Sequence, residues 1–184
     1  MDENTRSGPR RGRSCSVSIA ALLTLVPSVA WAQPALGTPD PARADAMHEE
    51  AEVLIQTQDK RSWKEAARLF ERAATLRAPD DAAAIYEQSL AGQLMYYVGS
   101  LSSSQANLAG AAERALRVGR VLEAAQLYLR AAFVARERGE APDAARFARS
   151  AKQLASSPHL SETQRQGILS RIIADAVSGR HGSY

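Results

Sequence analysis

The chain has 184 residues, a formal net charge of +3 and only 5% aromatic residues. This length is enough for one domain of ordinary size. The scarcity of aromatic side chains implies a core built mainly from Ala, Leu, Val and Ile, and the absence of alternating β-branched segments argues against a β-sheet.

The N-terminal segment, residues 1–32, has the features of a secretory signal peptide. Four arginines, from Arg6 to Arg13, precede an apolar segment over about residues 17–29, and Ala30-Trp31-Ala32 is typical of a cleavage site. The apolar segment is shorter than the roughly 20 residues that a membrane-spanning helix needs. We therefore predict cleavage after Ala32, a periplasmic or secreted protein, and no stable membrane insertion afterwards. The alternative is an uncleaved N-terminal anchor.

Loss of residues 1–32 changes the charge of the chain. This segment holds four of the 23 basic and two of the 20 acidic residues, which leaves 19 and 18 and a formal net charge of +1. Such a balance gives no support for binding nucleic acid or an anionic membrane through bulk charge. Cys15, the one cysteine, lies in the same segment, so the mature chain is expected to contain no disulfide.

The rest of the chain is predicted to be helical between two irregular ends. Residues 33–43 are rich in Pro and Gly and are expected to form a flexible linker, and residues 179–184 a disordered tail. The helical domain is expected over residues 44–178. Breaks at Gly, Ser and Pro divide it into about seven helices. The first five are expected over residues 42–58, 63–76, 80–98, 104–118 and 121–138. The sixth lies between the break at Gly139 and Pro158, and the seventh follows Pro158.

Two regions carry an ordered pattern of small and aromatic residues. In the first, Trp63, Ala66, Phe70 and Ala73 follow one another at steps of three, four and three on one helical face, where alanines let a partner helix approach closely. In the second, from Tyr128 to Pro158, small residues recur on both sides of Gly139, which favours the end of a helix. Pro142 and Asp143 suit the first turn of the next helix.

The order of residues in these regions resembles the tetratricopeptide (TPR) repeat, a helix–turn–helix unit with a period of about 34 residues. The resemblance covers about residues 44–158 and implies an all-α fold of antiparallel helix pairs stacked as an array. A similar pattern around Ala124 does not keep this phase, because the spacing from Ala66 to Ala124 is far longer than that from Ala124 to Ala144. An irregular, divergent repeat is therefore expected, with Ala66 and Ala144 facing partner helices.

The last helix is expected to cover the end of this array. Ser161 and Gln164 have the spacing of a capping box. The apolar residues that follow form a stripe: Ile168, Leu169, Ile172, Ile173, Ala176 and Val177. The stripe is expected to cover the preceding helix, or else to dock on a partner.

No catalytic constellation is evident. The three histidines, His48, His159 and His181, have no second histidine at metal-binding spacing, and His48 is expected on a helix surface. A glycine-rich phosphate loop and a G-x-S-x-G motif are absent from the sequence. We therefore predict no catalytic residue, no cofactor and no metal ligand.

The resemblance implies an adaptor that binds another protein or a peptide. Candidate binding residues are Tyr96, Tyr97, Arg130, Arg146 and Arg149. Adjacent tyrosines on a helix diverge by about 100°, so one should lie nearer the surface, and arginines match partner carboxylates. Other aromatics could join such a groove: Trp63, Tyr86, Tyr128 and Phe133. The alternatives are that Trp63, Phe70, Tyr86 and Tyr128 form the core and the arginines a solvated face, or that Met95, Tyr96 and the Gly110 region hold a lipid or other apolar ligand. The oligomeric state is not predicted.

Overall fold

The computed structural model describes residues 38–79 and 82–178, so the predicted signal peptide, the first part of the linker (residues 33–37) and the tail lie outside the described residues. Within these two ranges the chain forms seven α-helices and no β-strand, which confirms the predicted all-α class. The helices are α1 (Pro41–Ile55), α2 (Lys60–Leu76), α3 (Ala82–Tyr97), α4 (Leu101–Arg117), α5 (Val121–Glu137), α6 (Ala141–Ala155) and α7 (Glu162–Ser178).

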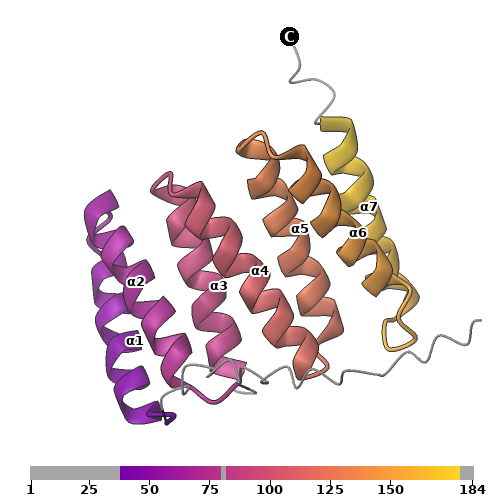
Figure 1. Cartoon of the computed structure of the whole chain (residues 1–184). Helices are drawn as coiled ribbons and strands as arrows, with labels where there is room; N and C mark the ends of the chain where they lie inside the picture. The colour runs from indigo at the N-terminus through magenta and orange to yellow at the C-terminus, as the bar shows by residue number, and fades with distance from the viewer. Residues whose placement is uncertain (1–37, 80–81, 179–184) are drawn as a thin grey trace, which may run out of the picture. The chain divides into compact units, whose positions relative to one another are not determined.

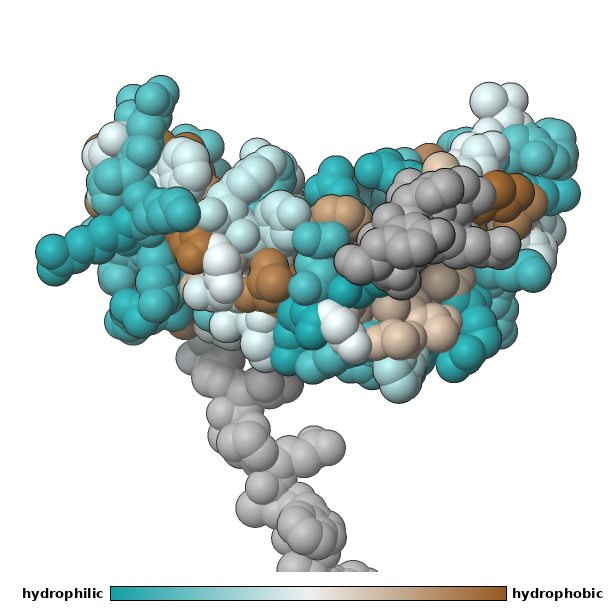
Figure 2. Space-filling model, turned by 90° about the horizontal axis from the view of Figure 1, so that it is seen from above, coloured by the Kyte–Doolittle hydropathy of each residue, from teal (hydrophilic) through white to brown (hydrophobic). Residues whose placement is uncertain are grey.

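The described residues all belong to one unit, residues 37–184, called here the helical unit. Each helix packs against the next, and α7 contacts α5 as well as α6. Successive helices run in opposite directions, with α2, α4 and α6 toward the viewer in Figure 1 and the odd-numbered helices behind them. Figure 2 shows the unit from above, hollowed along the side on which the odd-numbered helices lie.

The helix pairs repeat at a nearly constant step. The odd-numbered helices begin at Pro41, Ala82, Val121 and Glu162, so successive pairs start at almost equal intervals along the chain. The pairs are therefore more regular than the predicted irregular repeat. The pattern of small and aromatic residues recurs in α2, α5 and α6, and each of these helices packs against the helix before it and the helix after it. The pattern therefore reflects packing on two neighbours and does not depend on whether the helix is the first or the second of its pair.

Three turns share one geometry. Gly99, Gly119 and Gly139 follow α3, α4 and α5 with φ of 81°, 76° and 77°, a left-handed conformation that glycine adopts without a steric penalty. The N–H of the residue after each glycine donates to the carbonyl of the residue five positions before it, at 2.8–2.9 Å. This is the Schellman arrangement that ends helices, and it lets the chain reverse in a short turn.

Two helices begin earlier than predicted because aspartates cap them. The side chain of Asp40 accepts a hydrogen bond from the N–H of Arg43, and Pro41 fits the first helical position, so α1 begins before the predicted domain boundary at 44. Asp59 lies before the predicted start of α2 at residue 63, caps this helix and accepts from the N–H groups of Arg61 and Ser62. The helix therefore begins at Lys60.

The Asp59 cap is expected to weaken only in strong acid. Hydrogen bonds from Ser62, then Thr57 and Arg61, lower the pKa of Asp59 to about 2 from 3.8. Because the pKa is lowered by folding, the stabilisation is complete above the ordinary value and is lost as pH falls through about 2. An NMR titration of the Asp59 carboxyl carbon should show that midpoint, and Asp59→Asn should remove the linked change at the Ser62 amide. A midpoint near 4 would contradict the cap.

The core is made largely of alanine, with a few large side chains between helices. One cluster joins α1, α2 and α3 around Phe70, and a second extends from Ile85 on α3 to Ile168 on α7. Ala66 is fully buried. Ala144 packs against the second cluster and faces α5, as predicted, yet it is only partly buried. It borders a small cleft of about 170 Å³ with Leu129, Ala132 and Ile172.

This difference predicts unequal tolerance of a larger residue. Ala66→Leu should lower the free energy of unfolding by about 1–3 kcal/mol, because the side chain is fully buried and the added atoms would overpack the core. Ala144→Leu should cost less, because the cleft beside it can take the added atoms. Urea denaturation of both variants measures the two values. Equal losses would show that the cleft is not available to a side chain at position 144.

A buried ion pair joins the first three helices. The carboxylate of Glu87 on α3 is fully buried and accepts hydrogen bonds at 2.7–2.9 Å from Nε and Nη2 of Arg77, just after α2. Arg77 also donates to Asp45 on α1 at 2.8 Å. His48 lies 3.0 Å from Glu87 through Nδ1 and is partly buried, so its prediction as a surface residue is wrong.

The last helix begins and packs largely as predicted. The N–H of Ser161 donates to Gln164 Oε1 at 2.8 Å and the N–H of Gln164 donates to Ser161 Oγ at 3.2 Å, which confirms the capping box. Ile168 is 3% exposed, but Ile173 is 64% exposed, so the predicted stripe is narrower than expected. Ile173 follows Ile172 by about 100° around the helix. Ile172 therefore packs against the core, whereas Ile173 lies in solvent.

Candidate functional site: a groove along α3, α5 and α7

A groove of about 340 Å³ is lined by residues of α3, α5 and α7, with Leu108 of α4 between them. Its walls include Tyr96 and Tyr97 of α3, Arg130, Phe133 and Val134 of α5, and Arg171 of α7. These helices lie on the hollowed side of the unit in Figure 2. We call this the α3–α5–α7 groove.

Aromatic rings from α3 and α5 form part of its surface, and a ring of α2 supports them from outside the groove. The ring of Tyr96 lies 5.8 Å from that of Tyr97 and 5.7 Å from that of Phe133, and Tyr97 lies 6.1 Å from Trp63 of α2. These separations are within the favourable range for aromatic pairs. The rings therefore hold one another in place, and the groove has an ordered aromatic wall before any ligand binds.

The aromatic wall is open to solvent. Tyr97 is 52% exposed and Phe133 is 39% exposed, whereas Tyr96 is partly buried and Val134 is buried. The expectation that one of the adjacent tyrosines lies nearer the surface is confirmed. Both nevertheless line the same groove. Tyr96 packs beside Phe133 of α5, and Tyr97 packs beside Trp63 of α2.

The charged residues of the groove are all cationic. Arg130 and Arg171 are exposed, none of the lining residues is Asp or Glu, and neither arginine forms an ion pair with the side chains that the structure describes, those of residues 38–79 and 82–174. Elsewhere the arginines commonly have carboxylate partners, as in the pairs Arg68–Glu65, Arg120–Glu123, Arg138–Glu140 and Arg165–Glu162. The groove therefore carries positive charge that the described part of the chain does not neutralise.

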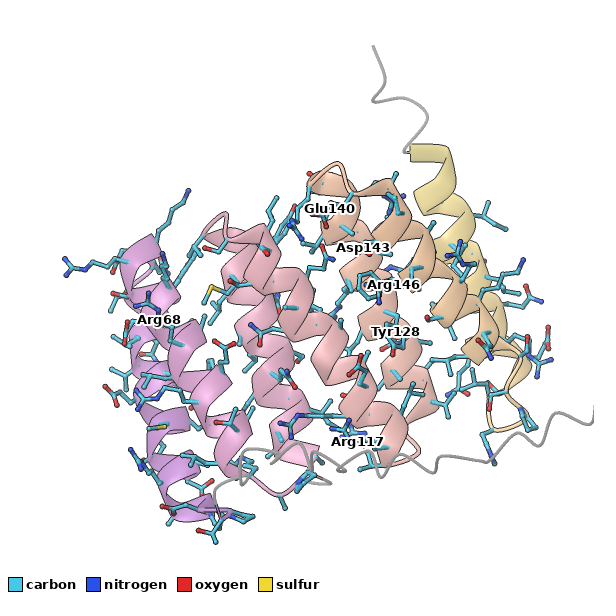
Figure 3. The ribbon with its side chains drawn as sticks, viewed as in Figure 1. Arg68, Arg117, Tyr128, Glu140, Asp143 and Arg146 are labelled. Atoms are coloured by element: carbon cyan, nitrogen blue, oxygen red, sulfur yellow. The ribbon has the colours of Figure 1, made fainter. Side chains whose placement is uncertain are left out.

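The other two predicted binding residues lie outside this groove, on α6. Figure 3 shows Glu140 at the turn before that helix, and Asp143 and Arg146 along its first part. Arg146 pairs with Asp143 at 3.2 Å, and its guanidinium lies 4.4 Å from the centre of the Phe147 ring. Arg149 is exposed on the same helix. The structure thus brings together Tyr96, Tyr97 and Arg130 and separates them from Arg146 and Arg149.

Arg146 belongs to a structural network instead. Asp143 accepts from Gln105 of α4 at 3.0 Å, and Gln105 accepts from Arg138, just after α5, at 2.7 Å. Beneath it, Phe147 stacks on Tyr128 at 6.1 Å, and burial raises the pKa of the Tyr128 hydroxyl. These contacts hold α4, α5 and α6 together, which accounts for Arg146 without a partner molecule.

The alternative ligand pocket near Met95 and Gly110 is filled by protein. Met95 is buried in the cluster that joins α1, α2 and α3. The space that a side chain would need at Gly110 is occupied by the amide of Gln88. Of the three features that suggested this pocket, only Tyr96 borders a groove.

Other kinds of site find no support in the described ranges. No cluster of three or more His, Cys, Asp and Glu side chains there is arranged to hold a metal ion. Among the helices described, none is both long and apolar enough to cross a bilayer. Comparison of the chain with protein-family models, curated proteins and solved structures gave no match.

Proposed function

We propose that the protein is an exported, TPR-like adaptor, without catalytic activity of its own, that binds a segment of another protein in the α3–α5–α7 groove. The observation that carries the proposal is the exposed aromatic wall of a groove that two arginines also line. Tyr, Phe and Arg are enriched at the centres of protein interfaces. A stacked helical array supplies an extended surface on which such residues can act together.

The TPR-like part of the proposal rests on residue order and on the helix pairs. The arrangement in helix pairs and a core made largely of alanine agree with it. The interval between the starts of successive pairs, such as Pro41 and Ala82, is longer than the period of about 34 residues in that family. The name therefore describes an architecture here and supports binding only by analogy.

Export follows from the sequence of residues 1–32. If the signal peptide is removed after Ala32, the mature protein begins at Gln33. The intact mass of protein recovered from the periplasm or the medium should match residues 33–184. A mass that includes residues 1–32 would support the retained anchor and contradict the exported soluble adaptor.

An open groove favours a polypeptide over an enclosed small ligand. Its volume of about 340 Å³ is at the lower end of the range for sites that bury a drug-sized molecule, and two of its rings are partly in water. Native mass spectrometry of the purified protein separates these alternatives. A retained small molecule would favour the apolar-ligand alternative, whereas the adaptor is expected at the mass of the polypeptide alone.

The direct test is affinity capture with groove variants. Tagged wild-type protein, crosslinked in the cells that produce it, should retain a partner that the Tyr97→Ala/Phe133→Ala variant loses. Tyr86→Ala is a matched control, because Tyr86 is as exposed as Tyr97, at 52%, and lies outside the groove. A partner retained equally by both variants would place binding elsewhere, and absence of any partner from all samples would count against an adaptor.

A further inference from the structure

The charge of the groove indicates the chemistry of what it binds. Arg130 on α5 and Arg171 on α7 come from different helices and border the same aromatic wall. Neither has a carboxylate partner among the residues that the structure describes, in contrast to Arg77, Arg138 and Arg146. Two guanidinium groups with no acidic neighbour in the lining favour an anionic ligand.

We propose that the groove is specific for an acidic polypeptide segment that carries a large apolar side chain next to its carboxylates. This inference rests on the proposed function, because it takes the groove as the binding site. The planar guanidinium group donates two parallel hydrogen bonds to a carboxylate. In the same groove as the two arginines, Tyr96, Phe133 and Val134 form an apolar surface that fits an aromatic or aliphatic side chain.

The shape of the site favours a chain segment over a membrane surface as the source of the carboxylates. The groove lies on the hollowed side of the helical unit. A flat lipid surface meets the rims of a hollow before its floor, whereas a protruding segment reaches the floor. The buried floor residues, Leu129 and Val134, would contact only such a segment.

The test is selection of random short peptides displayed on phage against the full-length mature protein. Enriched peptides should contain Asp or Glu close to a large apolar residue. Arg130→Glu/Arg171→Glu should weaken their binding by roughly tenfold or more, since hydrogen bonds to charged groups commonly contribute that much, and should itself select Lys- and Arg-containing peptides. The matched control is Arg72→Glu/Arg149→Glu, which makes the same charge change at exposed positions outside the groove.

The outcomes separate this inference from the proposed function. Enriched peptides that lose binding with Phe133→Ala but not with Arg130→Glu/Arg171→Glu would overturn the acidic specificity and leave the groove as a binding site. Equal weakening by both charge-reversed variants would show attraction to bulk charge and would also overturn it. Peptides indifferent to all groove variants, or no enrichment, would contradict both proposals. Circular dichroism of each variant confirms that the helices are retained.

Discussion

Replacing Arg77 with alanine should lower the free energy of unfolding by about 3–5 kcal/mol, because it leaves a buried charge without its partner. Glu87 is fully buried and depends on Arg77 for hydrogen bonds to both carboxylate oxygens. The hydrogen bonds to Glu87 raise the pKa of Arg77 above its ordinary value, so the guanidinium stays charged. The pair joins the end of α2 to α3, and urea denaturation followed by circular dichroism measures its loss.

Two further variants test the reason for this loss. Arg68→Ala breaks the ion pair between Arg68 and Glu65, and both of these side chains are more than half exposed. This variant should lower the free energy of unfolding by at most about 1 kcal/mol. Removing both buried charges in Arg77→Met/Glu87→Leu should restore much of the stability lost in Arg77→Ala. An Arg77→Ala variant as stable as Arg68→Ala would show that Glu87 is not held as a buried charge.

Removal of α7 should have an effect at least as large. Residues 33–158 alone are expected to be unstable or aggregated, because α7 and the turn before it bury Leu160 and Ile168 against α5 and α6. Each such side chain contributes on the order of 1.5–3 kcal/mol. Melting curves and size-exclusion chromatography of residues 33–158 and 33–184 test this. A truncated protein that stays folded and monomeric but loses its partner would make α7 a docking element instead.

Single substitutions on α7 distinguish lost packing from a general effect of truncation. Ile168→Ala should cost about 2–5 kcal/mol, because the side chain is 3% exposed. Ile173→Ala should change stability little, because that side chain is 64% exposed on the same helix. Similar losses at the two positions would mean that Ile173 is covered in solution, as a docking face would be.

The periodic part of the fold could be predicted from the sequence because its determinants are local. Gly99, Gly119 and Gly139 mark turns in the chain itself, and the Ser161–Gln164 pair acts within one helical turn. The order of helices and the close approach at Ala66 follow from the same kind of pattern. The start of α2 was misplaced because Asp59 and Ser62 are both good caps, and hydrogen-bond geometry decides between them.

The groove could be predicted only in part, because it depends on how helices are placed against one another. Tyr96, Tyr97 and Arg130 were identified, but Arg146 has the same sequence features as Arg130 and points elsewhere. Gln93 and Arg171 were missed, since each lies on the polar side of its own helix. The burial of His48 was missed for the same reason, because its partner, Glu87, lies on another helix far along the chain.

Site-specific photo-crosslinking from position 97 tests the central claim most directly. A photoreactive phenylalanine analogue replaces Tyr97 in one variant and Tyr86 in another, both at 52% exposure, and each is irradiated in the cells that produce the protein. A groove that binds a partner segment should give a discrete crosslinked protein from position 97 and none from position 86. The same product from both positions, or none from position 97, would contradict binding in the α3–α5–α7 groove.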